Sequence, residues 1–333
     1  MSAETPITVL MTVYNGERHL SAAVESILRQ TFRDFEFLVV DDASTDRSLD
    51  VLKSYALRDS RLRILENSSN KGQTACLNQG LREARGKWIA RQDADDLSLP
   101  TRLESHWNGI RANPDLVLTG VNGWIIDESS CCTGMIHVPL EDSGIRWSMP
   151  WRNPFIHTGV MFRAGEGFYD EDFRICQDWE LWSRLAERGR MLNIPERLIA
   201  YRHSPSSLSH SSQEKTESET REIVSRIWRK QFGEEIKQAE LLQFFRIGLG
   251  PRERKAFWTF YKTVNDRWGD KNEQAIAVHR LQAAGSLLNQ GSFLSFFDFV
   301  QAFLNSPIWF LKYIFQYIKI TVRPYSFGRC GLE

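Results

Sequence analysis

The feature that most constrains the fold of this chain is a regular alternation of apolar and amphipathic segments in its first hundred residues. Four short apolar runs predict buried strands, at Ile7–Val13, Phe35–Val40, Leu62–Leu65 and Trp88–Ala90. The segments between them carry apolar residues at helical spacing, among them Leu20, Ala23, Val24 and Ile27. Strands that alternate with helices in this way are typical of a parallel sheet with helices on both faces.

Polar side chains follow three of these runs. Thr12 and Tyr14 end the first run, Asp42 closely follows the second, and Asp93 and Asp95 follow the fourth. Because the carboxyl ends of parallel strands meet at one edge of a sheet, where open α/β sheets bind ligands, these side chains are expected to converge.

The spacing of Asp93 and Asp95 predicts that both carboxylates lie on the same side of an extended segment. Two carboxylates suit a hard divalent cation that keeps its other positions for water and substrate phosphates. At about 4 Å, two such charges repel by about 4 kcal/mol at an effective dielectric constant near 20, which favours a cation between them. A solvated acidic turn before Pro100 is the alternative.

Charge and cysteine usage exclude several classes of protein. Lys+Arg and Asp+Glu both number 42, so the chain lacks the basic excess of a nucleic-acid-binding protein. Five cysteines without a CxxC pair argue against a disulfide framework or zinc site and favour a reducing, cytoplasmic location. No signal peptide is predicted, and neither GxGxxG after the first run nor a P-loop motif occurs.

The second part of the chain carries further strand signals and one helix with acids at its start. Strands are predicted at Leu116–Ile126, Asn153–Arg163 and Met191–Ile199. His157 within the second of these either faces an acceptor or is a structural histidine. A helical stripe after Gln177 places Asp178 near a helix N-terminus, where an N-cap is the simplest role.

Beyond residue 203 the strand signals end. The Ser-rich segment 204–213 reads as a linker or as a loop that closes over a ligand, and 214–333 reads as mostly helical. The aromatic-rich segment 293–322 has one narrow polar face, but its longest uncharged run is too short to span a bilayer. Such a helix either lies in a membrane interface or packs on the catalytic domain or a second subunit.

Two stretches carry a resemblance to a known family. Residues 6–46, which begin PITVLMTVYNG and end VVDDASTD, and residues 70–96, which end RQDADD, resemble the family 2 glycosyltransferases. The resemblance implies an α/β fold of the GT-A type over residues 1–212, with a Rossmann-like, mostly parallel sheet flanked by helices. Residues 213–333 would form a helical C-terminal extension. It also implies an inverting transferase that uses a nucleotide-diphosphate sugar and Mg²⁺ or Mn²⁺.

The same resemblance implies roles for individual residues. Thr12 and Tyr14 would hold the nucleoside, and Asp42 would accept a hydrogen bond from its base. Asp93 and Asp95 would form the DxD motif, with Asp95 the direct metal ligand.

In the later part of the chain, the resemblance makes Asp178 the catalytic base. Gln177 departs from the Glu-Asp pair of the family, and Glu180 is a weaker candidate for the base. Arg202 and His203 would reach the diphosphate by charge-assisted hydrogen bonds, or His203 would assist the metal.

The expected partners are the sugar donor and a glycan or lipid-linked acceptor, without nucleic acid. A peripheral contact with the inner face of the cell membrane through 293–322 is also expected. Two other functions compete: a nucleotidyltransferase, for which the segment after the first run lacks a Gly-rich basic loop, and a non-catalytic nucleotide-sugar binding module.

Overall fold

A computed structural model describes residues 5–150, 152–203 and 213–232. The chain divides into two compact units, one formed by residues 1–140, 153–219 and 329–333 and the other by 141–152 and 220–328. The segment 293–322, predicted to contact a membrane or another protein surface, lies outside the described residues. Among the described helices, none combines the length and apolar character needed to cross a bilayer.

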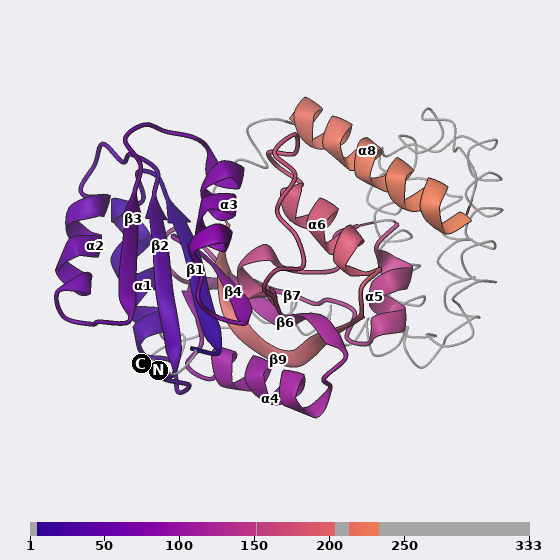
Figure 1. Ribbon diagram of the computed structural model, residues 1–333, viewed down its shortest axis with the longest axis horizontal. Coiled ribbons are helices and arrows are strands. Elements are labelled where there is room, and N and C mark those ends of the chain that lie inside the picture. Colours follow the sequence, from indigo (N-terminus) through magenta and orange to yellow (C-terminus); the bar gives the residue numbers. More distant parts are fainter. Residues whose placement is uncertain (1–4, 151, 204–212, 233–333) are drawn as a thin grey trace. The chain divides into compact units, whose positions relative to one another are not determined.

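The first unit contains a nine-stranded sheet. Its strands are β1 (Ile7–Val13), β2 (Phe35–Asp41), β3 (Leu62–Glu66), β4 (Trp88–Asp93), β5 (Leu97–Ser98), β6 (Leu116–Ile126), β7 (Cys132–Ile136), β8 (Met161–Arg163) and β9 (Arg190–Arg202). In the described part of the chain the helices are α1 (Glu17–Leu28), α2 (Ser48–Ala56), α3 (Gln73–Glu83), α4 (Arg102–Ala112), α5 (Asp142–Ser148), α6 (Gln177–Leu185) and α8 (Gln213–Phe232), with a 3₁₀ turn η1 (His157–Gly159) (Figure 1).

The strand order is β3-β2-β1-β4-β8-β6-β9-β5, and β7 pairs with β6. β1 runs parallel to both β2 and β4, and Thr12 is the register partner of Val40 on one side and of Asp93 on the other. The predicted α/β fold is confirmed, and the ends of these three strands meet at one edge. Beyond β4 the sheet is mixed, because β8 is antiparallel to its neighbours while β6 and β9 are parallel.

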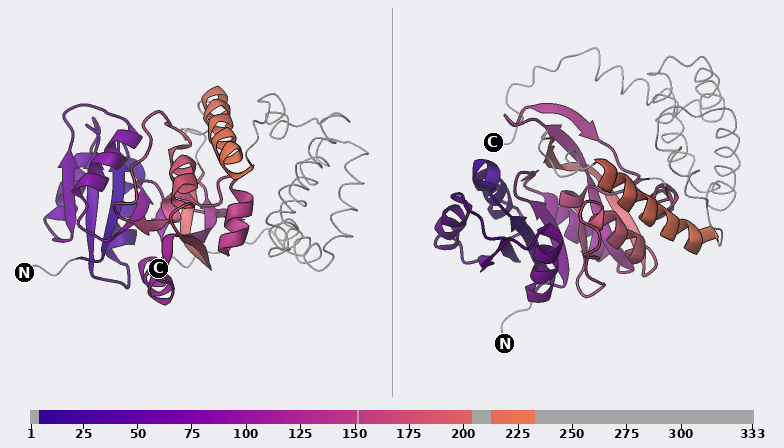
Figure 2. Two further views of the ribbon diagram at one scale, coloured as in Figure 1. Left: turned by 45° about the vertical axis from the view of Figure 1, so that its right-hand side comes forward. Right: turned by 90° about the horizontal axis from the view of Figure 1, so that it is seen from above.

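Alternate residues of β1 explain why helices cover both faces of this half of the sheet. Val9 and Met11 belong to the core cluster that also contains Leu20 and Val24 of α1. Leu10, between them, points to the other face, where a Cβ placed on Gly80 of α3 would lie 2.2 Å from it. Helix α3 therefore packs closely against the strands because Gly80 has no side chain, while α1 and α2 lie on the opposite face (Figures 1 and 2).

The structure corrects one predicted strand. Of Asn153–Arg163 only Met161–Arg163 is a strand, and residues 157–159 form the turn η1. The cause is local: Pro154 has no N–H for a ladder, and the Asn153 side-chain oxygen accepts the N–H of Phe155 at 3.1 Å, closing a turn.

The predicted domain boundary at residue 212 stays a prediction, and the first compact unit of the structure extends to Glu219. The Glu219 carboxylate, on α8, accepts N–H bonds at 2.8–2.9 Å from three successive residues, Arg174, Ile175 and Cys176. Glu219 is only 7% exposed, so these bonds are sheltered from water. The beginning of α8 therefore holds the segment that leads into α6.

We expect Glu219→Gln to lower the free energy of unfolding by about 2 kcal/mol, because a neutral amide oxygen replaces a carboxylate that accepts three hydrogen bonds. Urea denaturation measures the change. Glu222→Gln on the same helix is the control, since Glu222 is half-exposed and pairs with Arg226, and we expect a change below about 0.5 kcal/mol. Equal effects of the two substitutions would contradict a structural role for Glu219.

Candidate active site

Three acids lie where β4 ends, but the backbone there is not extended as the spacing predicts. Asp93 is the last residue of the strand, and the chain bends at Ala94 and Asp95 before β5. Asp96 is buried, and its Oδ1 accepts the backbone N–H of Arg202 at 2.6 Å. Asp96 thus ties the turn to the end of β9.

Asp93 and Asp95 differ in how their charges are balanced. The Oδ1 of Asp93 forms an ion pair at 2.6 Å with Nη2 of Arg91, whose side chain is fully buried. Burial, followed by the negative charge of Asp93, raises the pKa of Asp95 to about 6, although Arg202 and Arg91 act in the opposite direction. The Asp95 residue is nonetheless exposed to solvent. An internal cation therefore compensates part of the repulsion, and the excess negative charge is at Asp95.

Asp178 is the second residue of α6. The N-cap is Cys176, which makes no side-chain capping bond, so the N-cap alternative for Asp178 is wrong. Its Oδ2 accepts a hydrogen bond from Nδ2 of Asn153 at 2.6 Å. Burial raises the pKa of Asp178 to about 6, against hydrogen bonds from Trp179 N–H and Asn153 that lower it, and the charge of Asp93 adds to the rise.

The acids of β4 and α6 share one electrostatic environment. Burial raises the pKa of Tyr201, near the end of β9, to about 12, and the charges of Asp96, Asp93, Asp95 and Asp178 act in the same direction. The structure thus brings Asp178 to the edge of the sheet where the β4 acids lie.

An amide bridge also connects α6 to β4. Nε2 of Gln177 donates to Oε1 of Gln73 at 3.1 Å, and Nε2 of Gln73 lies 3.5 Å from Oδ1 of Asp93. Gln177 stands where the family has an acid. Here its amide, 3% exposed, contacts α3.

The predicted nucleoside-binding residues lie at the same edge. Thr12 is nearly buried beside Asp93, and the Tyr14 side chain is 51% exposed. The exposed ring of Tyr14, just beyond the end of β1, is available to a ligand, and the nucleoside contact of Thr12 and Tyr14 stays a prediction.

Asp42 is engaged by the protein itself. Its two oxygens accept hydrogen bonds from Nδ2 of Asn67 and from the N–H groups of Lys71 and Gly72, at 2.8–3.1 Å. Burial opposes ionisation of this carboxyl, but the hydrogen bonds hold its pKa below the usual value. In this structure Asp42 fixes the 67–72 loop ahead of α3, and a contact with a nucleobase stays a prediction.

Arg202 is also used internally. Its side chain is buried and donates to the carbonyl oxygens of Asp95 and Asp127, at 2.9 and 2.5 Å, and to Oγ of Ser130 at 3.0 Å. The guanidinium thus supports the loop that carries Asp95. His203 is exposed, and its N–H donates to the carbonyl of Ile126 at 2.9 Å. Contact of either residue with a diphosphate stays a prediction.

Two further sequence candidates have protein partners. Glu180 is 3% exposed and forms an ion pair with Arg184 at 2.7 Å. Nε2 of His157 lies 3.1 Å from the Tyr169 hydroxyl, and burial, followed by the charge of Arg91, lowers the pKa of His157 to about 3. Glu180 and His157 are therefore both engaged by neighbouring side chains, and the role of Asp178 as the base stays a prediction.

Among the residues that the structure describes, no three His, Cys, Asp or Glu side chains are arranged to hold a metal ion. Mg²⁺ commonly takes only one or two protein carboxylates and completes its coordination with water and substrate phosphates. Carboxylate oxygens such as those of Asp95 and Asp93 are suitable donors for such a site. Burial, followed by the charge of Asp93, raises the pKa of Asp95, and a bound cation would balance the second of these effects.

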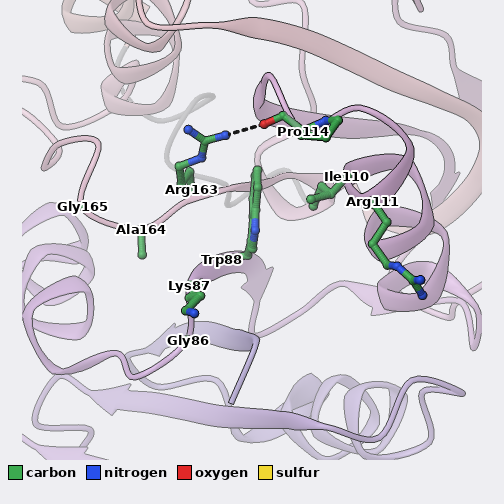
Figure 3. Close-up of a pocket in the computed structure, with 9 residues that line it drawn as sticks. All are labelled: Gly86, Lys87, Trp88, Ile110, Arg111, Pro114, Arg163, Ala164 and Gly165. Carbon is green, nitrogen blue, oxygen red and sulfur yellow. Dashed lines mark hydrogen bonds between the residues drawn. The ribbon is translucent and has the colours of Figure 1, made fainter. Parts of the chain in front are cut away.

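A separate hollow of about 720 Å³ lies at the other end of β4 (Figure 3). It is lined by Gly86, Lys87, Trp88, Ile110, Arg111, Pro114, Arg163, Ala164 and Gly165. None of the predicted site residues lines it, so it is distinct from the acid cluster.

The fold, with acids at the ends of β2 and β4, is that of a GT-A glycosyltransferase. Residues 8–164 match the sequence profile described as glycosyl transferase family 2. The chain is 34% identical over 220 residues to the Bacillus subtilis protein named glycosyltransferase EpsE, covering 64% of this chain and 78% of EpsE. It is 29% identical over 202 residues to the amylovoran biosynthesis glycosyltransferase AmsE of Erwinia amylovora, covering 59% of this chain and 75% of AmsE. The chain belongs to glycosyl transferase family 2 and is a glycosyltransferase.

Solved structures agree with the fold. Staphylococcus aureus TarS 1–349 in complex with UDP matches with a TM-score of 0.53 and 16% identity, covering 93% of this chain and 92% of that one. The mannosyltransferase PcManGT from Pyrobaculum calidifontis, in complex with GDP-Man and Mn²⁺, matches with a TM-score of 0.51 and 15% identity, covering 97% and 82%. At these identities the likeness shows the fold alone.

Proposed function

We propose that this enzyme transfers a sugar from a nucleotide-diphosphate sugar to an acceptor hydroxyl in glycan biosynthesis, with inversion at the anomeric carbon. The observation that carries the proposal is that α6 brings Asp178 to the end of β4. Gln177, the residue before Asp178, donates to Gln73, which lies 3.5 Å from Asp93, and the charge of Asp93 raises the pKa of Asp178. The structural neighbours named above are complexes with UDP and GDP-Man, and AmsE is named for polysaccharide biosynthesis.

In the proposed reaction Asp178 is the general base. With a pKa of about 6 it is ionised at neutral pH, yet basic enough to take a proton from the acceptor hydroxyl. The proton passes to the carboxylate as the acceptor oxygen bonds to the anomeric carbon and the bond to the diphosphate oxygen breaks. Because attack and departure occur on opposite faces of the sugar, a single displacement inverts the centre.

We assign the metal site to Asp95 and Asp93. When bound there, Mg²⁺ or Mn²⁺ would stabilise the negative charge of the departing diphosphate. Arg91 already neutralises one Asp93 oxygen, so Asp95 is the stronger ligand of the pair. The complex of PcManGT with GDP-Man and Mn²⁺ supports a divalent ion in this fold.

The remaining site residues are proposed to bind the nucleotide part of the sugar donor. Thr12, Tyr14 and Asp42 would contact the nucleoside, and Arg202 and His203 the diphosphate. A lipid-linked or glycan acceptor, a cytoplasmic location and peripheral membrane contact through 293–322 also remain proposals, the last on residues that the structure does not describe.

A donor panel tests the class of reaction. We expect one of UDP-GlcNAc, GDP-mannose or a dTDP-sugar, with Mn²⁺, to raise the apparent stability by about 2.7 kcal/mol at 100 times its Kd, and to release nucleoside diphosphate slowly by hydrolysis. Release of nucleoside monophosphate or pyrophosphate would instead indicate a nucleotidyltransferase. Stabilisation without any product would indicate a binding module.

A further inference from the structure

We propose that Asn153 is a positioning residue that holds the Asp178 carboxylate in the orientation and charge state required of the base. This inference rests on the proposed function, because it takes Asp178 as the base. Asn153 was not among the residues singled out in the sequence, and it lies in the turn where a strand was expected.

The orientation of the Asn153 amide is determined by its two neighbours. One end faces the backbone N–H of Phe155 at 3.1 Å, and an N–H can only donate, so that end must be the oxygen. The other end is therefore the NH₂ group, and it faces Oδ2 of Asp178 at 2.6 Å. The amide cannot flip without placing donor against donor at Phe155.

This geometry selects the ionised form of Asp178. The NH₂ group of Asn153 only donates, so Oδ2 must accept, and a short bond to a carboxylate is stronger than one to a neutral acid. The bond also stops rotation of the carboxylate plane. Asn153 thus opposes burial, which favours the protonated form of Asp178.

Asn153 is itself held in place relative to α6. Pro154 restricts the backbone that follows it, and the next side chain, Phe155, is 5% exposed. The Phe155 ring meets the ring of Trp182, one turn beyond Asp178 on α6, edge to face at 6.2 Å. The donor and the acceptor of the hydrogen bond are therefore carried by two segments that pack against each other.

Other ionisable groups face Asp178 from neighbouring elements. Asp93 of β4 raises its pKa, while Tyr169, ahead of α6, and Tyr201 of β9 both feel its charge. On α6 itself Glu180 is paired with Arg184. Burial raises the pKa of both Tyr169 and Tyr201, that of Tyr201 to about 12, so both phenols are neutral in the working range. Asp93 forms an ion pair with Arg91.

The experiment measures the pH dependence of nucleotide release from the donor that the wild-type enzyme hydrolyses, UDP-GlcNAc or GDP-mannose, with Mn²⁺. In Asn153→Ala we expect the acidic limb of the profile to move up by about 1 pH unit, with roughly fivefold slower release at pH 6 and roughly tenfold slower release below pH 5. In Asn153→Asp the oxygen that closes the turn remains, while a negatively charged oxygen replaces the NH₂ group that faces Asp178. We expect a larger shift of the acidic limb in the same direction. The affinity for the nucleotide sugar should not change in either variant.

Asn122→Ala is the matched control. Asn122 is 5% exposed and makes the same kind of contacts, donating to the carbonyl of Pro195 at 2.8 Å and accepting the N–H of Val138 at 2.9 Å. We expect this variant to lose stability but to keep the wild-type pH midpoint, because neither contact involves Asp178.

Two outcomes separate the inference from the proposed function. The positioning role is overturned if both Asn153 variants keep the wild-type pH profile or if Asn122→Ala shows an equal shift. Strongly slowed release by Asp178→Asn in the same experiment would leave the assignment of the base standing. If Asp178→Asn releases nucleotide as fast as wild type, the assignment of the base fails, and the inference fails with it.

Discussion

Asp178→Asn is expected to slow sugar transfer by about 10²–10⁴-fold, the usual contribution of a general base. An amide has nearly the volume of the carboxylate but cannot take a proton from the acceptor. The fold should tolerate the change, because burial disfavours the negative charge at this position and the new side chain can still offer an oxygen to Asn153. Donor affinity should stay close to that of the wild type.

The pH dependence of the transfer rate gives an independent test of Asp178 as the base. The pKa of Asp178 is raised to about 6, so the base is ionised above this pH and becomes protonated below it. The wild-type rate should therefore fall about tenfold per pH unit in acid, and the residual rate of Asp178→Asn should not show this limb. Loss of folding with unchanged specific activity in the variant would mean that Asp178 is only structural.

Asp95→Asn is expected to reduce metal-stimulated turnover by about 10³-fold, equivalent to about 4 kcal/mol of transition-state stabilisation. The substitution removes the acid whose charge is least compensated at the end of β4. Chelation of the metal by EDTA should lower the wild-type rate similarly and should have little further effect on the variant. Asp50→Asn, an exposed acid on α2, is the control and should leave turnover unchanged.

Asp95→Asn is expected to lower activity without lowering the thermal stability of the metal-free protein. Because the pKa of Asp95 is raised above its ordinary value in the folded protein, its ionised form costs folding free energy at neutral pH. Without metal, Asp95→Asn should therefore melt at the same temperature as the wild type or higher. Full activity in excess EDTA, or wild-type turnover in the variant, would contradict the metal-dependent mechanism.

One contact between side chains of the site could have been anticipated from the sequence. Arg91 directly follows the predicted buried strand Trp88–Ala90, and a charge at that position needs a partner, which in the structure is Asp93. Glu219 and Gln73 carried no comparable signal, because their partners lie far away along the chain.

The sequence by itself determined the parallel half of the sheet and the edge where the site lies. Alternating periodicities are local, so β1 to β4, their helices and the acids that follow could be identified without any long-range contact. They also placed Asp178 at the start of a helix.

Only the tertiary structure decided which of these residues meet. The mixed pairing of β8, β6 and β9 brings α6 to the edge formed by β4, and so sets Asp178 beside Asp93. The tertiary structure also places Asp42 and Arg202 in hydrogen bonds with the protein's own backbone. It brings the amide of Asn153 into contact with the carboxylate of Asp178. Hydrogen bonding and charge compensation depend on distances between segments remote in sequence, which periodicity and spacing do not encode.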